Sequence, residues 1–471
     1  MIIEKASCYL SRRYIIEMLF FSMLIPVFPQ NSLINGFLEN GVLVGTNQNL
    51  PFWMFSNQFG RFSPKPINGY LDFGLFIDTL NTGINKLKVT TGLEGFLRYD
   101  KTWNGWIHQG YVETTLGKFS AFIGNKEEHF GIQDPSLSSG FILWSGNSRP
   151  FPKVTINLQD WVEIPFMKHF VHLKAGFAHG WFGNDGYVKK AFFQHTYFYL
   201  RFGGNNNFHL NLGVHHVAQW GGISPEFGEL PNSFLDFIKV LLVLKTDTSN
   251  VFFPQTERHN RLGNHLGTRD VSFGYQFTNG TKFLFYWQNF IEDITGLGFR
   301  NAMDGLWGLQ ISMKNNLEFC YEFVNTLTDP SLTIVNGIIP GIDDYFNNRI
   351  YGRYAYKGNT IGTPFITSPV LFIDMNNLYY IANNRLRAHY IAFSYAYRFS
   401  KFEIKYSYTN NYGYKLLLLT PSLKQHSIYF MLERNFSYRY HLGYKIAAET
   451  DIGKFLGNRI GLSLSIKYYF K

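Results

Sequence analysis

The sequence is poor in cysteine, with only Cys8 and Cys320 among its 471 residues. Removal of an N-terminal leader would leave Cys320 alone, so a scaffold held together by disulfides is excluded. Cys320 lies between Glu318 and Glu322 along one strand face. Because neighbouring carboxylates disfavour a thiolate, we do not expect Cys320 to be a reactive nucleophile.

Charged residues are also scarce. They make up 16% of the chain, whereas a soluble domain usually carries about 25%. Aromatic residues reach 18%, with 48 Phe and 30 Tyr. The formal net charge is +10, but we find no Lys/Arg-rich run of the kind that binds nucleic acid, so no nucleic-acid partner is expected. An acidic partner at a membrane surface fits the basic balance better.

Long hydrophobic runs are missing as well. No stretch after the N-terminal segment reaches 18 apolar residues, which excludes a transmembrane helix. At the N-terminus, Arg12 and Arg13 precede an apolar stretch over 18–28. This pattern is typical of a signal peptide and predicts export, with residues 1–30 as the leader and cleavage between Phe28 and Leu33. An uncleaved amphipathic segment is the alternative.

Motifs of common enzyme families are absent: the sequence contains no H-E-x-x-H, G-x-S-x-G or G-x-x-x-x-G-K-[ST]. His215 and His216 are adjacent, so on a strand they point to opposite faces and cannot chelate one metal. Glu127 and Glu128 are adjacent in the same way. Two distant loops could still place carboxylates roughly 5–9.5 Å apart for glycoside hydrolysis. We expect no enzymatic activity, no cofactor and no metal.

Strict alternation of apolar and polar residues is what the chain does have. The last twelve residues, IGLSLSIKYYFK, place Ile460 and every second residue after it on one apolar face. A second alternating pair, 391–399 and 402–408, flanks a tight turn at Ser400 and Lys401 and predicts an antiparallel hairpin. The same alternation is found in four further segments, 171–177, 198–202, 208–214 and 438–446.

The polar faces of these strands decide between two architectures. They carry Arg398, Glu403 and Lys405, which suit the wet lumen of a transmembrane barrel whose apolar face lies in lipid. The expected short turns alternate with a longer connection over 410–422, as in bacterial outer-membrane barrels. We therefore predict an all-β antiparallel outer-membrane barrel over 66–471, with a soluble sandwich as the alternative. Residues 31–65, which include LPFWMFSNQFGRF, are either a small helical plug or a first strand.

Several short motifs are not explained by alternation and occur in order along the chain: GNKEEHFG with SSGFILWSGNSRPFP, LGNHLG, IED with NAMDGLWG, YEFVNT, and DYFNNRIYG with IGTPF. In these motifs the chain resembles the Wzi-like capsule assembly proteins of the outer membrane of Gram-negative bacteria, in the form common in Bacteroidetes. The resemblance implies a barrel of about eighteen strands with a periplasmic helical plug. It also implies a lectin that holds exported polysaccharide at the cell surface, and no enzyme.

Sugar-binding sites use aromatic rings against sugar faces and planar polar groups, and Arg grips a carboxylate with two hydrogen bonds. Candidate polysaccharide-binding residues of these types lie in the motifs: Trp144, Arg149, Glu127, Glu128, Asp304, Trp307, Tyr345, Asn347, Asn348 and Arg349. The alternative for each is a structural role, in which Glu127, Glu128, Arg149 and Asp304, together with Glu292, form a charge network that fills the lumen.

Three functions are compatible with this interpretation: a surface lectin for capsular or related polysaccharide, a passive porin-like diffusion channel, and an enzyme acting on glycans or lipids. The resemblance favours the lectin. Its expected partners are surface or capsular polysaccharide, outer-membrane lipid and, during biogenesis, the barrel assembly machinery, whose recognition signal the terminal strand ending in Phe470 and Lys471 resembles.

Overall fold

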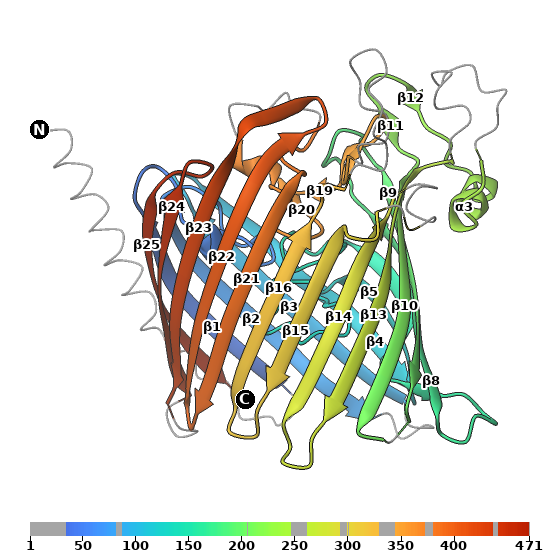
Figure 1. The fold of residues 1–471 in the computed structure, drawn as a ribbon, viewed down its shortest axis with the longest axis horizontal. Helices are drawn as coiled ribbons and strands as arrows, with labels where there is room; N and C mark the ends of the chain where they lie inside the picture. Colours follow the sequence, from blue (N-terminus) through green and yellow to red (C-terminus); the bar gives the residue numbers. More distant parts are fainter. Residues whose placement is uncertain are drawn as a thin grey trace, which may run out of the picture.

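The chain forms one closed antiparallel barrel in the computed structural model (Figure 1). The structure describes residues 34–81, 87–204, 206–245, 261–292, 299, 301–328, 344–372, 380–436 and 441–470. The first strand, β1, pairs with β2 on one side and with the last strand, β25, on the other, which closes the sheet. The predicted leader lies outside the described residues.

The wall of the barrel has eighteen strands, because the two-residue β7 (Val162–Glu163) continues β6 along the same neighbour, β8. The wall strands are β1 (Ile34–Gly45), β2 (Ile67–Asn81), β3 (Leu87–Tyr99), β4 (Trp103–Leu116), β5 (Phe119–Asn125), β6 (Lys153–Leu158), β8 (Val171–Trp181), β9 (Phe192–Phe202), β10 (Phe208–Trp220), β13 (Asn264–Gln276), β14 (Lys282–Ile291), β15 (Gly305–Ser312), β16 (Leu317–Asn325), β21 (Leu386–Tyr397), β22 (Ser400–Tyr414), β23 (Leu417–Asn435), β24 (Leu442–Gly453) and β25 (Arg459–Phe470).

Short elements occupy the connections: α2 (Phe52–Phe55), β11 (Ile223–Ser224), β12 (Gly228–Glu229), α3 (Phe234–Leu241), β17 (Asn347–Asn348), β18 (Gly352–Arg353), β19 (Ala355–Tyr356), β20 (Asn359–Thr360) and η1 (Pro369–Leu371). None of the helices in the described part of the chain is long and apolar enough to span a membrane.

The apolar faces of the wall strands point outward, as predicted. In β25, Ile460, Leu462 and Leu464 are 43–59% exposed on the outer wall, while Ser465 is buried on the inner side. A row of exposed aliphatic side chains on a closed barrel is the surface that lipid covers in outer-membrane proteins. The polar positions between them face the lumen.

The two ends of the barrel differ. Short turns join β4 to β5, β15 to β16 and β21 to β22 at the end that also holds the C-terminus (Figure 1). Long connections, including 126–152 and 221–263, leave the opposite end. This asymmetry assigns the short-turn end to the periplasm and the other end to the cell exterior. The longer connection expected over 410–422 is wrong, because β22 and β23 continue through it to a two-residue turn at Lys415 and Leu416.

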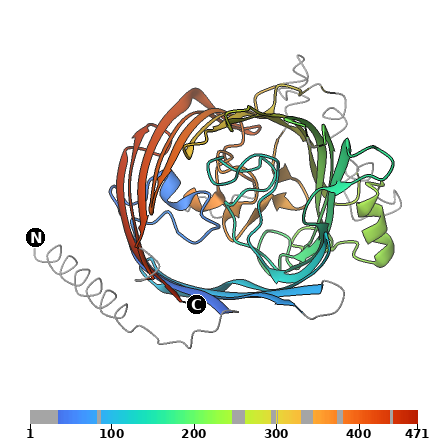
Figure 2. The same ribbon diagram turned by 90° about the horizontal axis from the view of Figure 1, so that it is seen from below.

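The lumen is filled by three connections that fold inward from the extracellular end, over 46–66, 126–152 and 344–385, the last described in part (Figure 2). Their apolar side chains form a buried core inside the barrel, which includes Trp53, Phe55, Ile142, Tyr354 and Phe365. Among the described residues, the helical parts of this plug are α2, four residues long, and the three-residue 3₁₀ helix η1. The plug therefore enters from the exterior and not as the periplasmic helical plug that the resemblance implied.

Side chains of the wall accept hydrogen bonds from the backbone of the plug. Glu449 and Asp451 on β24 accept the N–H groups of Trp53 (2.7 Å) and Phe52 (3.1 Å). Gln288 on β14 accepts the N–H of Ile142 at 3.0 Å. Because the plug has little regular structure, its buried peptide groups need such external acceptors, and the polar lumen face of the barrel provides them.

Glu322 on β16 is the most heavily used of these acceptors. It accepts hydrogen bonds from the Ser138 hydroxyl (2.5 Å), from the Ser139 N–H (2.9 Å) and hydroxyl, and from the Tyr286 hydroxyl. Its side chain is fully buried. One carboxylate therefore joins the wall to the connection over 126–152.

The substitution Glu322→Ala should loosen the plug and leave the barrel closed. Each buried donor that loses its acceptor costs about 1–3 kcal/mol. We expect a lower unfolding temperature and a higher single-channel conductance in planar bilayers, with the gel mobility of a folded barrel retained. Glu229→Ala, at an exposed position on β12, is the matched control. Equal stability and conductance in the two variants would contradict this role for Glu322.

Candidate functional site

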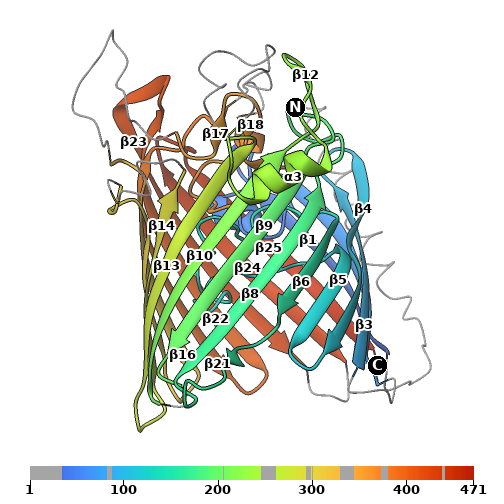
Figure 3. The ribbon, with the colours of Figure 1, turned by 90° about the vertical axis from the view of Figure 1, so that its right-hand side faces the viewer.

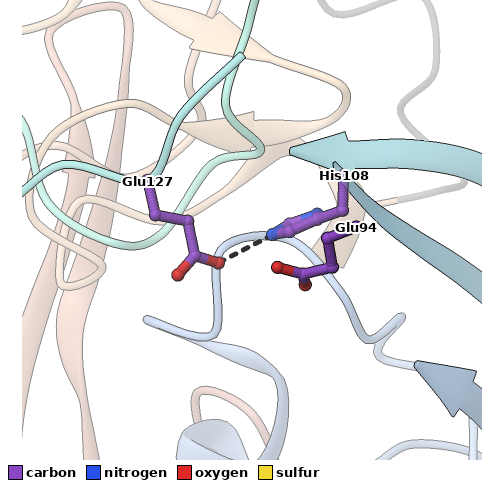
Figure 4. Close-up of side chains that lie close together, drawn as sticks. All are labelled: Glu94, His108 and Glu127. Carbon is purple, nitrogen blue, oxygen red and sulfur yellow. Dashed lines mark hydrogen bonds and ion pairs between the residues drawn. The ribbon is translucent and has the colours of Figure 1, made fainter. Parts of the chain in front are cut away.

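A partly buried arginine connects the plug to the wall beneath the extracellular mouth. Arg61, from the connection over 46–66, places Nη2 2.5 Å from Glu94 Oε1 and Nη1 2.5 Å from Glu127 Oε1. Its Nε lies 3.6 Å from Asp72 Oδ2, and His108 Nε2 lies 2.7 Å from Glu127 Oε1 (Figure 4). These contacts join residues of β2, β3 and β4 to two of the three inward connections.

Glu94, His108 and Glu127 together have the composition of a metal site, with ligand atoms within 4.8 Å of one another. However, the Arg61 guanidinium contacts both carboxylates, so a cation already compensates their charge. Burial alone would raise the pKa of Glu127, but Arg61 and the hydrogen bond with His108 outweigh it and lower that pKa. The geometry indicates a structural ion-pair network and not a metal centre.

Replacing Arg61 by Ala should destabilise the protein by about 3–5 kcal/mol, because buried carboxylates lose their partner. The pKa of Glu127 is lowered from its ordinary value of 4.5. The stability that it contributes is therefore present above pH 4.5 and lost as the pH falls through the folded-state pKa. The difference between wild type and Arg61→Ala should shrink on acidification in thermal unfolding measured from neutral to acidic pH. Arg434→Ala, at an exposed position, is the control, and a pH-independent difference would contradict the assignment.

A second arginine lies above this network, at the extracellular mouth. The guanidinium carbon of Arg149 is 3.5 Å from the centre of the Trp106 ring, and Arg149 Nε donates to the Gly60 carbonyl at 3.2 Å. The guanidinium of Arg98 lies 5.4 Å from the same ring. Arg98 is paired with Asp100 at 2.9 Å, whereas Arg149 forms no ion pair with a carboxylate of the described residues. Burial and then the nearby Arg98 lower the pKa of Arg149 to about 10, so it stays charged at neutral pH.

The surroundings of Arg149 add further positive charge. We define the Arg149 patch as Lys65, Arg98, Trp106, Arg149, Arg353, Tyr356 and Lys357. Two acidic side chains are interspersed: Asp100 lies 3.1 Å from Lys65 and Asp185 lies 3.8 Å from Lys357. Burial raises the pKa of Tyr356 to about 12, so its hydroxyl remains a hydrogen-bond donor. The patch therefore holds more cations than anions at the extracellular mouth, over two rings, Trp106 and Tyr356, that belong to the buried core or pack against it.

The other predicted residues of the connection over 126–152 lie inside the plug. Trp144 is buried, stacked on Phe151 with ring centres 5.5 Å apart and packed against Phe130 at 4.8 Å. Glu128 is paired with Lys153 Nζ at 2.5 Å. Together with the Glu127–Arg61 pair, these contacts match the structural alternative, in which the charges fill the lumen.

Asp304 and Tyr345 are also buried, and the Tyr345 hydroxyl donates to Asp304 at 2.8 Å. Asp304 accepts further hydrogen bonds from Thr328 and Asn325. Burial raises the pKa of this carboxyl. These contacts hold together the extracellular ends of β14–β16 and the connection that follows them.

Asn347 and Asn348 stabilise the plug. Asn347 Oδ1 accepts the Ile381 N–H at 2.6 Å, and Asn348 Oδ1 accepts the N–H groups of Ile350 and Tyr351 at 2.9 and 3.0 Å. Asn348 therefore performs the local backbone capping for which Asn is favoured in turns, whereas Asn347 joins two distant segments of the plug.

Trp307 and Arg349 lie at the surface, in different environments. Trp307 on β15 points away from the lumen, since its neighbours Leu306 and Gly308 are buried, and it packs against Trp287 with ring centres 5.3 Å apart. It belongs to the aromatic surface of the outer wall. Arg349 is about half exposed on the extracellular side, 4.0 Å from Glu226. Of the ten predicted residues, Arg149 is the one that lies in the patch.

Sequence reasoning missed Trp106, Arg98 and Tyr356. Trp106 lies in the segment YDKTWNGW. Nothing in the composition of this segment distinguishes Trp106 from the other aromatic residues at strand ends of this chain. Arg98 is an ordinary inward polar position of β3, and Tyr356 comes from a connection more than 200 residues away in sequence. Only the closed barrel brings the three together.

The family model for the capsule assembly protein Wzi matches residues 79–367, which is more than half of the chain. The chain belongs to this family. It is an outer-membrane barrel, and the resemblance found in its short motifs is confirmed. Among proteins of curated function, none matches it.

Two solved structures share the fold. One is Wzi of Escherichia coli, described as an outer-membrane protein involved in group 1 capsule assembly and a carbohydrate-binding β-barrel. It is 13% identical, with a TM-score of 0.59, over 91% of this chain and 83% of that one. The other is OccK3 (OpdO) of Pseudomonas aeruginosa, 12% identical with a TM-score of 0.50, over 93% and 95%. At these identities the likeness shows the fold alone.

Proposed function

We propose that this member of the Wzi family is an outer-membrane lectin, which binds capsular or related surface polysaccharide at its extracellular mouth and helps attach it to the cell. The family match and the carbohydrate-binding description of the E. coli protein support this proposal. The observation that carries it is the Arg149 patch, which lies above a filled lumen.

The stack of Arg149 on Trp106 prepares the guanidinium for an anionic ligand. The ring covers one face of the guanidinium and Gly60 fixes Nε, so the orientation of the side chain is set before binding. The terminal N–H donors remain at the edge of the group, in the geometry that grips a carboxylate with two hydrogen bonds. Acidic sugars within a polysaccharide present such carboxylates, which makes them the favoured ligand.

The passive channel is less well supported. A diffusion channel needs a water-filled lumen, but the inward connections place a buried apolar core there, which includes Trp53, Ile142 and Tyr354. We therefore propose that the protein conducts little.

We also propose that it acts by binding and not by catalysis. The carboxylates among the candidate residues are held by partners: Glu127 by Arg61, Glu128 by Lys153 and Asp304 by several hydrogen bonds. Lipid around the wall and the assembly machinery acting on the last strand complete the proposed partners. The proposed leader, residues 1–30, is removed on export.

Binding of the source organism's surface polysaccharide to the detergent-purified barrel tests the proposal. Arg149→Ala should weaken binding at least tenfold, because a charged hydrogen bond contributes about 1.5–3 kcal/mol. Arg149→Lys keeps the positive charge but removes the planar pair of N–H donors. We therefore expect a loss of affinity smaller than that of Arg149→Ala. Affinity should also fall as salt is raised.

Arg201→Ala is the matched control, because Arg201 also stacks on a tryptophan, Trp161 at 3.9 Å, at the periplasmic end. Binding that is unchanged in Arg149→Ala and lost in Arg201→Ala would move the site to the periplasmic end. No binding by a correctly folded barrel would overturn the lectin proposal.

A further inference from the structure

The helix α3 lies outside the barrel, on the outer wall near its extracellular end (Figure 3). It packs on the ends of three wall strands, through Phe237 and Val240 against Ala218 and Trp220 of β10. Phe237 also meets Phe177 and His179 of β8 with ring centres 6.3 and 5.8 Å away. This inner contact fixes the position of the helix on the wall.

A second apolar face of α3 points away from the barrel. Phe234 is 75% exposed and Leu235 is 70% exposed, and Leu242 at the end of the helix is also exposed. At about 100° per residue, Phe234, Leu235, Ile238 and Leu242 fall in one sector. Leu241 joins that sector to the one that holds Phe237 and Val240, so the outward face and the packed face form one apolar arc of about 220°.

The polar residues of α3 occupy the remaining sector and satisfy one another. Ser233 and Asp236 form a reciprocal cap at the N-terminus of the helix, and Lys239 Nζ lies 3.6 Å from Asp236 Oδ1. A surface helix in water normally has one apolar stripe and a polar remainder. An apolar arc this wide, beside one narrow polar edge, instead suits a helix with protein on one side, lipid on another and water on the third.

The outward face is continuous with the lipid-facing wall. Val214 of β10 and its cross-strand neighbour Phe198 of β9 are both exposed on the outer surface. Ala218, beneath α3, is four residues further toward the exterior along β10, about 13 Å along the tilted strand. The helix therefore lies at the upper border of the apolar band, where the outer leaflet ends.

We propose that α3 is an interfacial anchor, whose outward face inserts between the acyl chains of the outer leaflet beside the barrel. A second protein copy is the less suitable occupant, because a stable interface buries about 800 Å² on each partner, more than one face of an eight-residue helix offers. The inference stands apart from the proposed lectin function.

The anchor would restrain the extracellular surface. The connection over 221–263 that carries α3 also contacts other extracellular segments: Ile223 pairs with Lys189, and Glu226 lies 4.0 Å from Arg349. Fixing α3 in the leaflet therefore fixes the height of these segments above the membrane. The outer surface of the protein is held to the lipid as well as to the barrel.

Nitroxide accessibility in phosphatidylcholine nanodiscs tests this assignment. Single cysteines at Phe234→Cys and at the polar-edge position Lys239→Cys, about 140° apart around the helix, carry the label in a Cys8→Ser, Cys320→Ser background. Val214→Cys is the lipid reference and Leu416→Cys, an exposed leucine at the tip of the β22–β23 hairpin, is the water reference. Collision rates with oxygen, which partitions into lipid, and with a water-soluble nickel chelate are compared.

We expect the label at Phe234 to match Val214, with oxygen favoured several-fold over nickel relative to Leu416, and the label at Lys239 to be open to nickel. A Phe234 label that matches Leu416 would overturn the anchor. A Phe234 label closed to both reagents would show a protein contact and overturn it in favour of a second copy. Equal behaviour at Phe234 and Lys239 would show that α3 has no fixed orientation, which also overturns it.

Discussion

Buried peptide groups of the plug are the constraint on which this structure depends. The three inward connections have little regular secondary structure, so many of their N–H groups cannot be satisfied within the plug. A buried peptide group without a partner is costly. The barrel solves this with acceptors on its lumen face: Glu449, Asp451, Gln288 and Glu322 each accept backbone N–H groups of the plug. The polar positions of these strands therefore match the hydrogen-bond donors of particular segments of the plug backbone.

This requirement explains why the same strands carry such different faces. Outside, lipid demands aliphatic and aromatic side chains and accepts almost any arrangement of them. Inside, the apolar core around Trp53 and Tyr354 must fit against carboxylates and amides at fixed positions. The residue types of the outer face are thus determined by contact with lipid, and those of the inner face by packing and hydrogen-bond geometry. In the sequence, the charged side chains of the lumen are polar positions of strands. In the structure, most of them attach the plug to the wall.

The sequence predicted the wall well and the site poorly, for the same physical reason. Alternation is a local property, so the outward face of β25 and the hairpin of β21 and β22 were visible in the sequence. Trp144 was expected at a ligand but lies in an irregular connection, where no period shows whether a ring is buried. Trp307 lies on a strand between two buried residues, Leu306 and Gly308. Because side chains alternate between the two faces of a strand, Trp307 points outward. The Arg149 patch joins residues that are far apart in the sequence. The alternation of apolar and polar residues carries no information about such contacts.

Gly60 couples the candidate site to the plug beneath it. Its φ of +62° favours glycine, and a Cβ there would lie 2.8 Å from Arg149 Cγ, so the arginine approaches as closely as it does because no side chain intervenes. The Gly60 carbonyl accepts Arg149 Nε, and the next residue, Arg61, binds Glu94 and Glu127. A ligand that holds Arg149 would therefore pull on the same turn that fixes the plug to β3 and to the connection over 126–152. In such an arrangement the rigidity of the plug and the orientation of Arg149 are one property.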